Sequence, residues 1–141
     1  MHADSAIEKL QNRGHRITKI RQAVITVFAQ SHYPISAGDI LIQLTVGGFY
    51  ANKSTVYREL TFLARVGLIR EVRLTNTRVH YESSYIPHHH HLICNKCGSV
   101  REIFCRELEL PLERVIEQAE RKGFAVKDHS LEFFGFCIAC R

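Results

Sequence analysis

The sequence has no apolar run long enough to cross a bilayer, and no charged segment followed by an apolar one near its start. It therefore predicts neither a membrane span nor a secretory signal, and a reducing cytosol is the expected compartment. Disulfides are rare in such a compartment. The five cysteines among the 141 residues consequently favour a role other than cross-linking.

Four of these cysteines form two Cys-x-x-Cys pairs, Cys94/Cys97 and Cys137/Cys140. Four thiolates in two closely spaced pairs suit the tetrahedral shell of a structural zinc, and Gly98 permits a tight turn after the first pair. A redox dithiol would place a pair at the start of a helix, whereas Cys94 follows a strand-like segment. The fifth cysteine, Cys105, has no pair partner and is expected to be a partly buried, small apolar residue, with a ligand of a further metal site or a reactive thiol as the alternatives.

Positive charge is confined to the first part of the chain. Residues 1–86 carry 11 Lys and Arg against 6 Asp and Glu, whereas residues 87–141 carry 8 of each, so the whole net charge of +5 lies in the first part. We therefore expect a basic domain over residues 1–82, a hinge over 83–87 and a neutral domain over 88–141. Nucleic acid is the natural partner of a basic domain, and a merely solvated basic face is the alternative.

Helical periodicity predicts four helices in the basic domain. Capping residues Ser5, Thr18 and Ser36 begin the first three, and Asn52 or Ser54 begins the fourth. In the fourth helix an apolar stripe repeats at helical spacing, which leaves polar side chains on its other faces. The members of this stripe are Val56, Leu60 and Leu63.

Two extended runs, 68–74 and 78–82, follow the fourth helix, and Thr75-Asn76-Thr77 joins them as a hairpin. Helices followed by a two-stranded wing are typical of a winged helix-turn-helix, with the helix from Ser54 in the major groove. A purely structural helical domain is the alternative. The candidate DNA contacts are Arg16, Ser54, Thr55, Tyr57 and Arg58.

The remainder of the chain predicts a small α/β domain. A strand is expected over 100–104, then a helix with Pro111 in its first turn and Gly123 after its end, and strands over 124–126 and 131–136. Some 55 residues make a marginal core, so zinc and a partner subunit are the expected supplements. The predicted fold class is α+β, a winged helix-turn-helix followed by a small α/β dimerisation domain with a four-cysteine zinc site.

Four consecutive histidines, His88 to His91, enter the first cysteine pair. Because alternate residues of a strand face opposite sides, His89 and His91 share one face, and His88 and His90 share the other. Glu82 and Glu102 could complete a mixed nitrogen and oxygen shell with His89 and His91, suited to Fe²⁺, Mn²⁺, Zn²⁺ or Co²⁺. The alternative for each glutamate is an exposed strand carboxylate.

Five segments together carry a resemblance to the ferric uptake regulator family. They are Arg16-Ile17-Thr18-x-x-Arg21, Ser54-Thr55-Val56-Tyr57-Arg58, the run from His88 to Gly98, Asp128-His129-Ser130-Leu131-Glu132 and the terminal Cys-x-x-Cys. The resemblance implies a homodimeric, metal-dependent transcriptional repressor. It also implies binding to A·T-rich inverted repeats in duplex DNA, upstream of metal-uptake or stress genes.

The resemblance also implies three metal sites. It puts structural zinc on the four paired cysteines and the regulatory metal on Glu82, His89, His91 and Glu102. An additional site would fall on His88, His90 and His129, with Glu109 or Glu113 as the fourth ligand. Iron-type members also take a histidine where this chain has Pro34, and His32 is the nearest candidate for that ligand.

Departures from the family pattern reduce the number of metals or signals to which the protein is expected to respond. Zinc-uptake members are expected to have Asp or His at the position of Arg70 and a Cys where Ser83 and Ser84 stand, and peroxide-sensing members have an aspartate at the position of Glu102. The resemblance therefore implies an iron or manganese responder, with a zinc-uptake regulator as the alternative. A metalloenzyme would need a substrate cleft that nothing in the sequence specifies, and a metal buffer would leave the basic domain unexplained.

Overall fold

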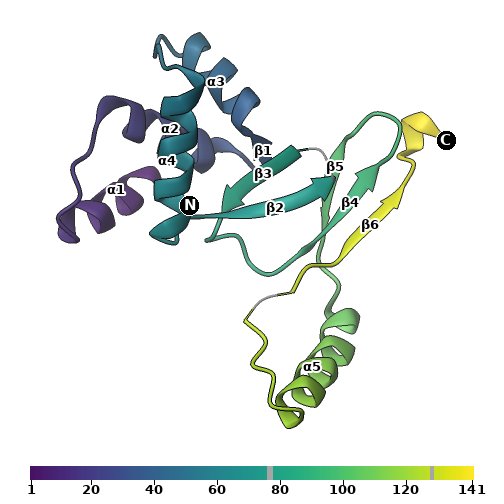
Figure 1. The fold of residues 1–141 in the computed structure, drawn as a ribbon. Coiled ribbons are helices and arrows are strands. Elements are labelled where there is room, and N and C mark those ends of the chain that lie inside the picture. Colours follow the sequence, from purple (N-terminus) through teal and green to yellow (C-terminus); the bar gives the residue numbers. More distant parts are fainter. Residues whose placement is uncertain (76–77, 128) are drawn as a thin grey trace. The chain divides into compact units, whose positions relative to one another are not determined.

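The computed structural model describes residues 1–75, 78–127 and 129–141. The chain forms two compact units, Met1–Pro87 (unit 1) and His88–Arg141 (unit 2) (Figure 1). Asn76 and Thr77 of the predicted hairpin turn lie outside the described residues, as does Asp128. Within the described ranges, no helix combines the length and apolar character that crossing a bilayer requires.

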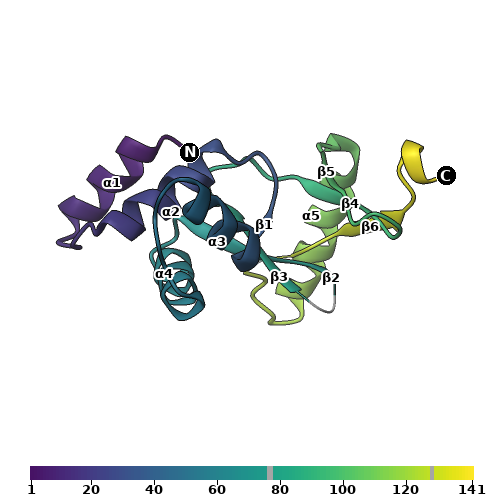
Figure 2. The same cartoon turned by 90° about the horizontal axis from the view of Figure 1, so that it is seen from above.

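Unit 1 combines a helical cluster with a small sheet. Its elements are α1 (Ala3–Asn12), α2 (Lys19–Gln30), β1 (Ile35–Ser36), α3 (Ala37–Val46), α4 (Lys53–Arg65), β2 (Ile69–Thr75) and β3 (Arg78–Ser83). The strands pair antiparallel in the order β1-β3-β2, and α2, α3 and α4 all contact this sheet (Figures 1 and 2).

Side-chain caps begin three of the four helices, as predicted. The Thr18 hydroxyl accepts a hydrogen bond from the Arg21 amide, Ser36 forms a capping box with its helix, and Asn52 rather than Ser54 caps α4. The prediction for α1 was wrong, because that helix begins at Ala3 and has no side-chain cap. The earlier start adds a turn of backbone hydrogen bonding ahead of Ser5, with the Ala6 amide donating to the His2 carbonyl.

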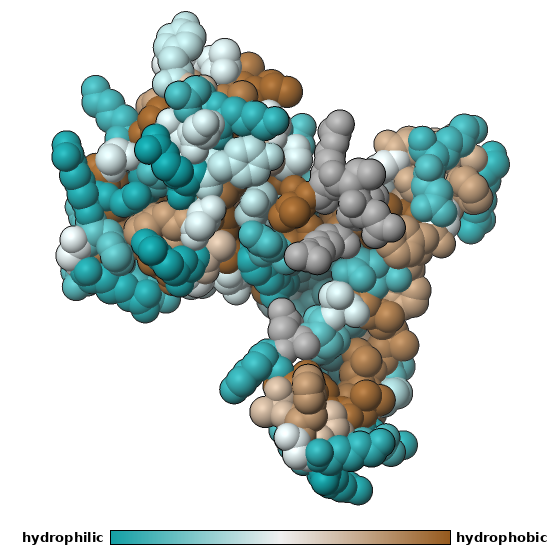
Figure 3. All heavy atoms as spheres, viewed as in Figure 1, coloured by the Kyte–Doolittle hydropathy of each residue, from teal (hydrophilic) through white to brown (hydrophobic). Residues whose placement is uncertain are grey.

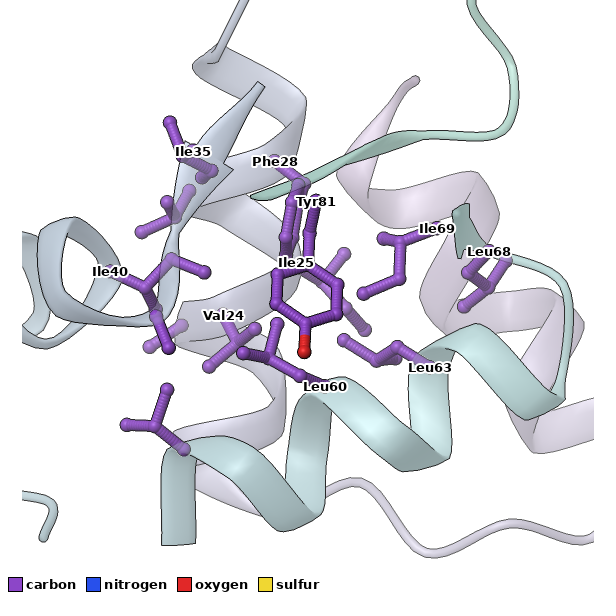
Figure 4. Packing of buried hydrophobic residues seen from close by; sticks show 14 of the residues in the cluster. Val24, Ile25, Phe28, Ile35, Ile40, Leu60, Leu63, Leu68, Ile69 and Tyr81 are labelled. Carbon is purple, nitrogen blue, oxygen red and sulfur yellow. The ribbon is translucent and has the colours of Figure 1, made fainter. Parts of the chain in front are cut away.

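A single apolar core holds unit 1 together. The predicted stripe of α4 is fully buried, with Val56, Leu60 and Leu63 each at 0% exposure. It packs against α2 and α3 and against the ring of Tyr81 from β3 (Figure 4). The sequence did not predict β1, whose two residues are too few to show strand alternation; Ile35 nevertheless pairs with Tyr81 and extends the sheet.

Unit 2 is a three-stranded sheet with one long helix. Its elements are β4 (His90–Cys94), β5 (Val100–Ile103), α5 (Arg106–Arg121), β6 (Glu132–Gly135) and a short 3-10 turn, η1 (Ile138–Cys140). Strand β4 is central, antiparallel to β5 and parallel to β6. The strand expected over 124–126 is absent from the described residues.

Helix α5 starts at Arg106, earlier than the sequence predicted. Pro111 lies inside the helix rather than at its first turn, so the Glu107 carbonyl lacks the usual donor four residues later. This start places Glu109 in the first turns of the helix. A helix that began at Pro111 would leave Glu109 outside it. The observed start makes Glu109 part of α5, and this is the glutamate that the helix presents to the histidine segment.

Unit 2 exposes much of its apolar surface. Ile93 and Cys94 are the only buried apolar residues among its described positions, and α5 has no buried residue. Hydrophobic side chains gather over α5 and the neighbouring strands (Figure 3). The large exposed ones are Leu92, Phe104, Leu110, Val115, Phe124, Phe133, Phe134, Phe136 and Ile138. Such a surface is typical of an interface rather than of a monomer in water.

Candidate metal centres and nucleic-acid interface

The four paired cysteines meet at one end of the unit 2 sheet. Cys94 ends β4, and Cys97 follows in the turn at Gly98. Cys137 directly precedes η1, and Cys140 is the last residue of η1. One sulfur from each cysteine lies within 4.8 Å of the others, and the Cys97 and Cys137 sulfurs are 3.8 Å apart. A tetrahedron with Zn–S bonds of about 2.3 Å has S···S edges of about 3.8 Å, so the spacing fits a zinc site made of four cysteines.

Hydrogen bonding shifts the pKa values of these thiols in opposite directions. The Cys137 amide donates to the Cys94 sulfur at 3.4 Å, and this bond is the largest of those that lower the pKa of Cys94 to about 5. Hydrogen bonding to the Cys137 and Cys97 sulfurs raises the pKa of Cys140 to about 12. Binding of a metal to this cluster would therefore use a sulfur that ionises readily at Cys94 and would displace a proton from Cys140.

One face of the histidine segment gathers His89, His91 and Glu102. The Nε2 atoms of His89 and His91 are 3.2 Å apart, and both side chains are buried. Glu102 lies opposite His91 on β5, with its Oε1 atom 4.0 Å from Nε2 of His89. This Oε1 atom is buried and has no hydrogen-bond partner among the described residues. Two imidazoles and an unsatisfied carboxylate oxygen make a donor set that fits a divalent cation.

The 3.2 Å separation of the two nitrogens suits both tetrahedral and octahedral metal coordination. Two nitrogens at about 2.05 Å from a common ion are about 3.4 Å apart in a tetrahedral shell and about 2.9 Å apart in an octahedral one. The observed value lies between these limits.

The two remaining candidates for the regulatory site belong to unit 1. Glu82 is buried in β3, where the Arg70 guanidinium of β2 pairs with it. His32 is exposed in the loop between α2 and β1, and it joins none of the His, Cys, Asp and Glu clusters found among the described residues.

The other face of the histidine segment gathers His88, His90, His129 and Glu109. Oε1 of Glu109 is 3.1 Å from Nε2 of His90 and 3.4 Å from Nε2 of His88. The His88 and His129 ring centroids are 4.8 Å apart. Glu109 is the glutamate that α5 brings to this cluster, whereas Glu113 is exposed and outside it.

The candidate DNA contacts of unit 1 lie mainly at the start of α4. Ser54, Tyr57 and Arg58 are exposed, and Arg58 donates to the Thr55 hydroxyl at 3.3 Å. Arg16 is exposed in the segment before α2. No sequence pattern indicated Glu59, which faces inward from the same helix and pairs with Arg21.

Three comparisons bear on this arrangement. A sequence model of the Ferric uptake regulator family matches residues 12–134. A ferric uptake regulation protein from Synechococcus elongatus is 33% identical over 99% of this chain and 95% of its own length.

Two solved structures share the fold. The ferric uptake regulator from Francisella tularensis with iron has a TM-score of 0.77 at 28% identity, covering 90% of this chain and 95% of its own. A zinc uptake regulator complexed with zinc and DNA has a TM-score of 0.66 at 29% identity, covering 97% of this chain and 91% of its own. Winged-helix DNA recognition and a zinc held by four cysteines are consistent with this fold.

Proposed function

The chain belongs to the ferric uptake regulator family, and from that premise we propose that it is a metal-dependent transcriptional repressor that acts as a homodimer. The pair formed by His89 and His91, beside the unsatisfied Oε1 atom of Glu102, carries this proposal. Cys94, Cys97, Cys137 and Cys140 would hold a structural zinc. The family gives no support to the alternatives of a metalloenzyme or a metal buffer.

We assign the regulatory metal to His89, His91 and Glu102, together with Glu82. Glu82 lies six residues before His88 along the chain, so the link between the units is short. A cation held by residues of both units would favour one arrangement of those units. A coupling of about 1 to 3 kcal/mol, typical of allostery, changes DNA affinity roughly 5- to 150-fold.

Fe²⁺ or Mn²⁺ is the metal we propose for this site, with Zn²⁺ as the alternative. A carboxylate and two imidazoles suit all three ions. Arg70 stands where a zinc-uptake member would be expected to supply a ligand, and it neutralises Glu82 instead. The likeness to a zinc uptake regulator keeps zinc as the second candidate. We assign His88, His90, His129 and Glu109 to an additional site, and we leave Glu113 and His32 out of the proposed ligand sets.

The DNA-binding surface is proposed to be the start of α4 together with Arg16. Two copies would read the two halves of an A·T-rich inverted repeat, because a two-fold dimer matches a palindromic operator. The exposed apolar surface of unit 2 supports homodimerisation, since burying it removes those side chains from water. Transcription is repressed in this scheme when the metal-loaded dimer occupies the operator.

The test compares Glu102→Ala with the wild-type protein and with the charge-matched control Glu120→Ala, an exposed position on α5. Duplex affinity is measured with and without Fe²⁺, Mn²⁺ or Zn²⁺, and bound zinc is counted separately. We expect Glu102→Ala to lose the metal-induced gain in affinity while keeping one zinc per chain, and Glu120→Ala to behave as wild type. An unchanged metal response in Glu102→Ala would sink the regulatory assignment.

A further inference from the structure

The side chain of Arg21, in the first turn of α2, connects two parts of unit 1 that carry candidate DNA contacts. Its Nε and Nη2 atoms donate to the Glu59 carboxylate of α4 at 2.8 and 3.3 Å. Its Nη1 atom donates to the backbone carbonyl of Arg16 at 2.6 Å. The guanidinium carbon also lies 3.7 Å from the centroid of the Phe62 ring on α4.

These contacts have the geometry of a fixed clamp rather than of a loose surface pair. The two side chains of the ion pair are only 14% and 13% exposed, so solvent screens their attraction less than it would at the surface. A two-pronged contact between a guanidinium and a carboxylate also restricts the relative orientation of the planar groups. Arg21 thus directs N–H groups of both arms inward, toward Glu59 and the Arg16 carbonyl.

The segment before α2 is held against α4 at a second point. The His15 ring packs nearly perpendicular to the same Phe62 ring, at an interplanar angle of 84° and a centroid distance of 5.1 Å. The backbone on either side of the peptide bond between His15 and Arg16 is therefore tied to α4, while the Arg16 side chain remains exposed.

We propose that Arg21 is a positioning residue for DNA recognition, which holds the Arg16 segment at a fixed place beside α4. Arg16 and the start of α4 can then contact one duplex together without ordering the segment at the time of binding, a cost that would reduce affinity. Pairing with Arg21 also neutralises Glu59, a carboxylate on the helix that faces phosphate. This inference rests on the proposed DNA binding.

For Glu59→Ala, the change in charge and the loss of positioning predict opposite changes in DNA affinity. Removing a carboxylate makes the protein more positive, so electrostatics alone would tighten binding to DNA. Positioning predicts weaker binding, roughly tenfold, because Arg21 loses its anchor on α4. Glu8→Ala, an exposed change on α1 with the same charge difference, is the matched control and should bind at least as tightly as wild type.

A double-mutant cycle with Arg16 distinguishes two roles for Arg21, which are positioning of the Arg16 segment and direct contact with a phosphate. Affinity and its salt dependence are measured for Arg16→Ala, Arg21→Gln and the double variant. If Arg21 acts through Arg16, each single variant lowers the salt slope by about one and the double variant lowers it no further. Additive losses in the double variant would mean that Arg21 contacts DNA independently, and would overturn the proposal.

Hydrogen exchange in the DNA-free, zinc-loaded protein gives a readout that does not depend on DNA binding. Amides of residues 15–18 should exchange faster in Glu59→Ala than in wild type or Glu8→Ala, while amides of the α4 core remain protected. Unchanged exchange at residues 15–18 would refute the clamp. A different result is also informative: exchange is faster in Glu59→Ala, but the wild-type protein binds no duplex DNA. In that case the clamp exists, but the proposed function is wrong, and so is the role of Arg21 in DNA recognition. If Glu59→Ala does not fold, Glu59→Gln can replace it, because glutamine removes the charge but keeps a hydrogen-bond acceptor. We expect Glu59→Gln to weaken DNA binding and to speed exchange at residues 15–18, but by less than Glu59→Ala.

Discussion

Loss of the four-cysteine site should unfold unit 2 and leave unit 1 folded. The perturbation is Cys97→Ser, which removes one of the four sulfurs that lie within 4.8 Å of one another. A structural zinc contributes about 10 to 16 kcal/mol at neutral pH in small zinc domains. Burial of Ile93, the one large aliphatic side chain buried among the described residues of unit 2, contributes only about 3 kcal/mol.

The assay is hydrogen exchange read separately over the two units, with zinc counted per chain. We expect Cys97→Ser to hold no tightly bound zinc and to lose protection throughout β4, β5 and β6. The core of α2, α3 and α4 should remain protected, because it does not depend on the metal. Cys105→Ser is the matched control, since Cys105 lies outside the sulfur cluster and should keep both zinc and protection. Protected β4 amides in zinc-free Cys97→Ser would refute the reasoning.

Two other predictions concern the zinc cluster and the unit 1 core. Zinc affinity, measured by chelator competition from pH 6 to 8, should rise about tenfold per pH unit for each proton released. Cys140, whose pKa is raised to about 12 by hydrogen bonding to its neighbours, still holds its proton in this window and supplies at least one, so a flat profile would contradict the assignment. Leu60→Ala, at a fully buried position of α4, should lower the unfolding free energy of unit 1 by about 2 to 5 kcal/mol in urea titration, without changing zinc content.

Local patterns predicted the parts of the fold that depend on neighbouring residues. The caps at Thr18 and Ser36 were visible because a capping residue acts on backbone groups two or three positions away. Strand alternation predicted the division of the histidines between two clusters, although β4 begins only at His90 and the alternation continues through His88 and His89 ahead of it. The apolar stripe of α4 was likewise a local signal, and the structure buries all of it.

Features that depend on the start of an element or on distant partners were not predictable in the same way. The choice between Glu109 and Glu113 turned on where α5 begins, and Pro111 gave a misleading signal because proline favours the first turn. The pairing of Arg21 with Glu59 joins residues 38 positions apart. No local pattern in the sequence marks such a pair, since only tertiary packing brings the two helices together.

Strand β4 makes the metal clusters of unit 2 interdependent. The strand ends at Cys94, which pairs with Gly135 of β6, and its other end carries the histidines. Because side chains alternate along a strand, a register slip of one residue against β5 would exchange the two histidine faces and move Glu102 away from His91. Zinc bound by Cys94 and the cysteines that follow β6 would oppose such a slip. The structural zinc is therefore expected to set the register on which the regulatory site depends, so that its removal abolishes the metal response even where every histidine ligand is intact.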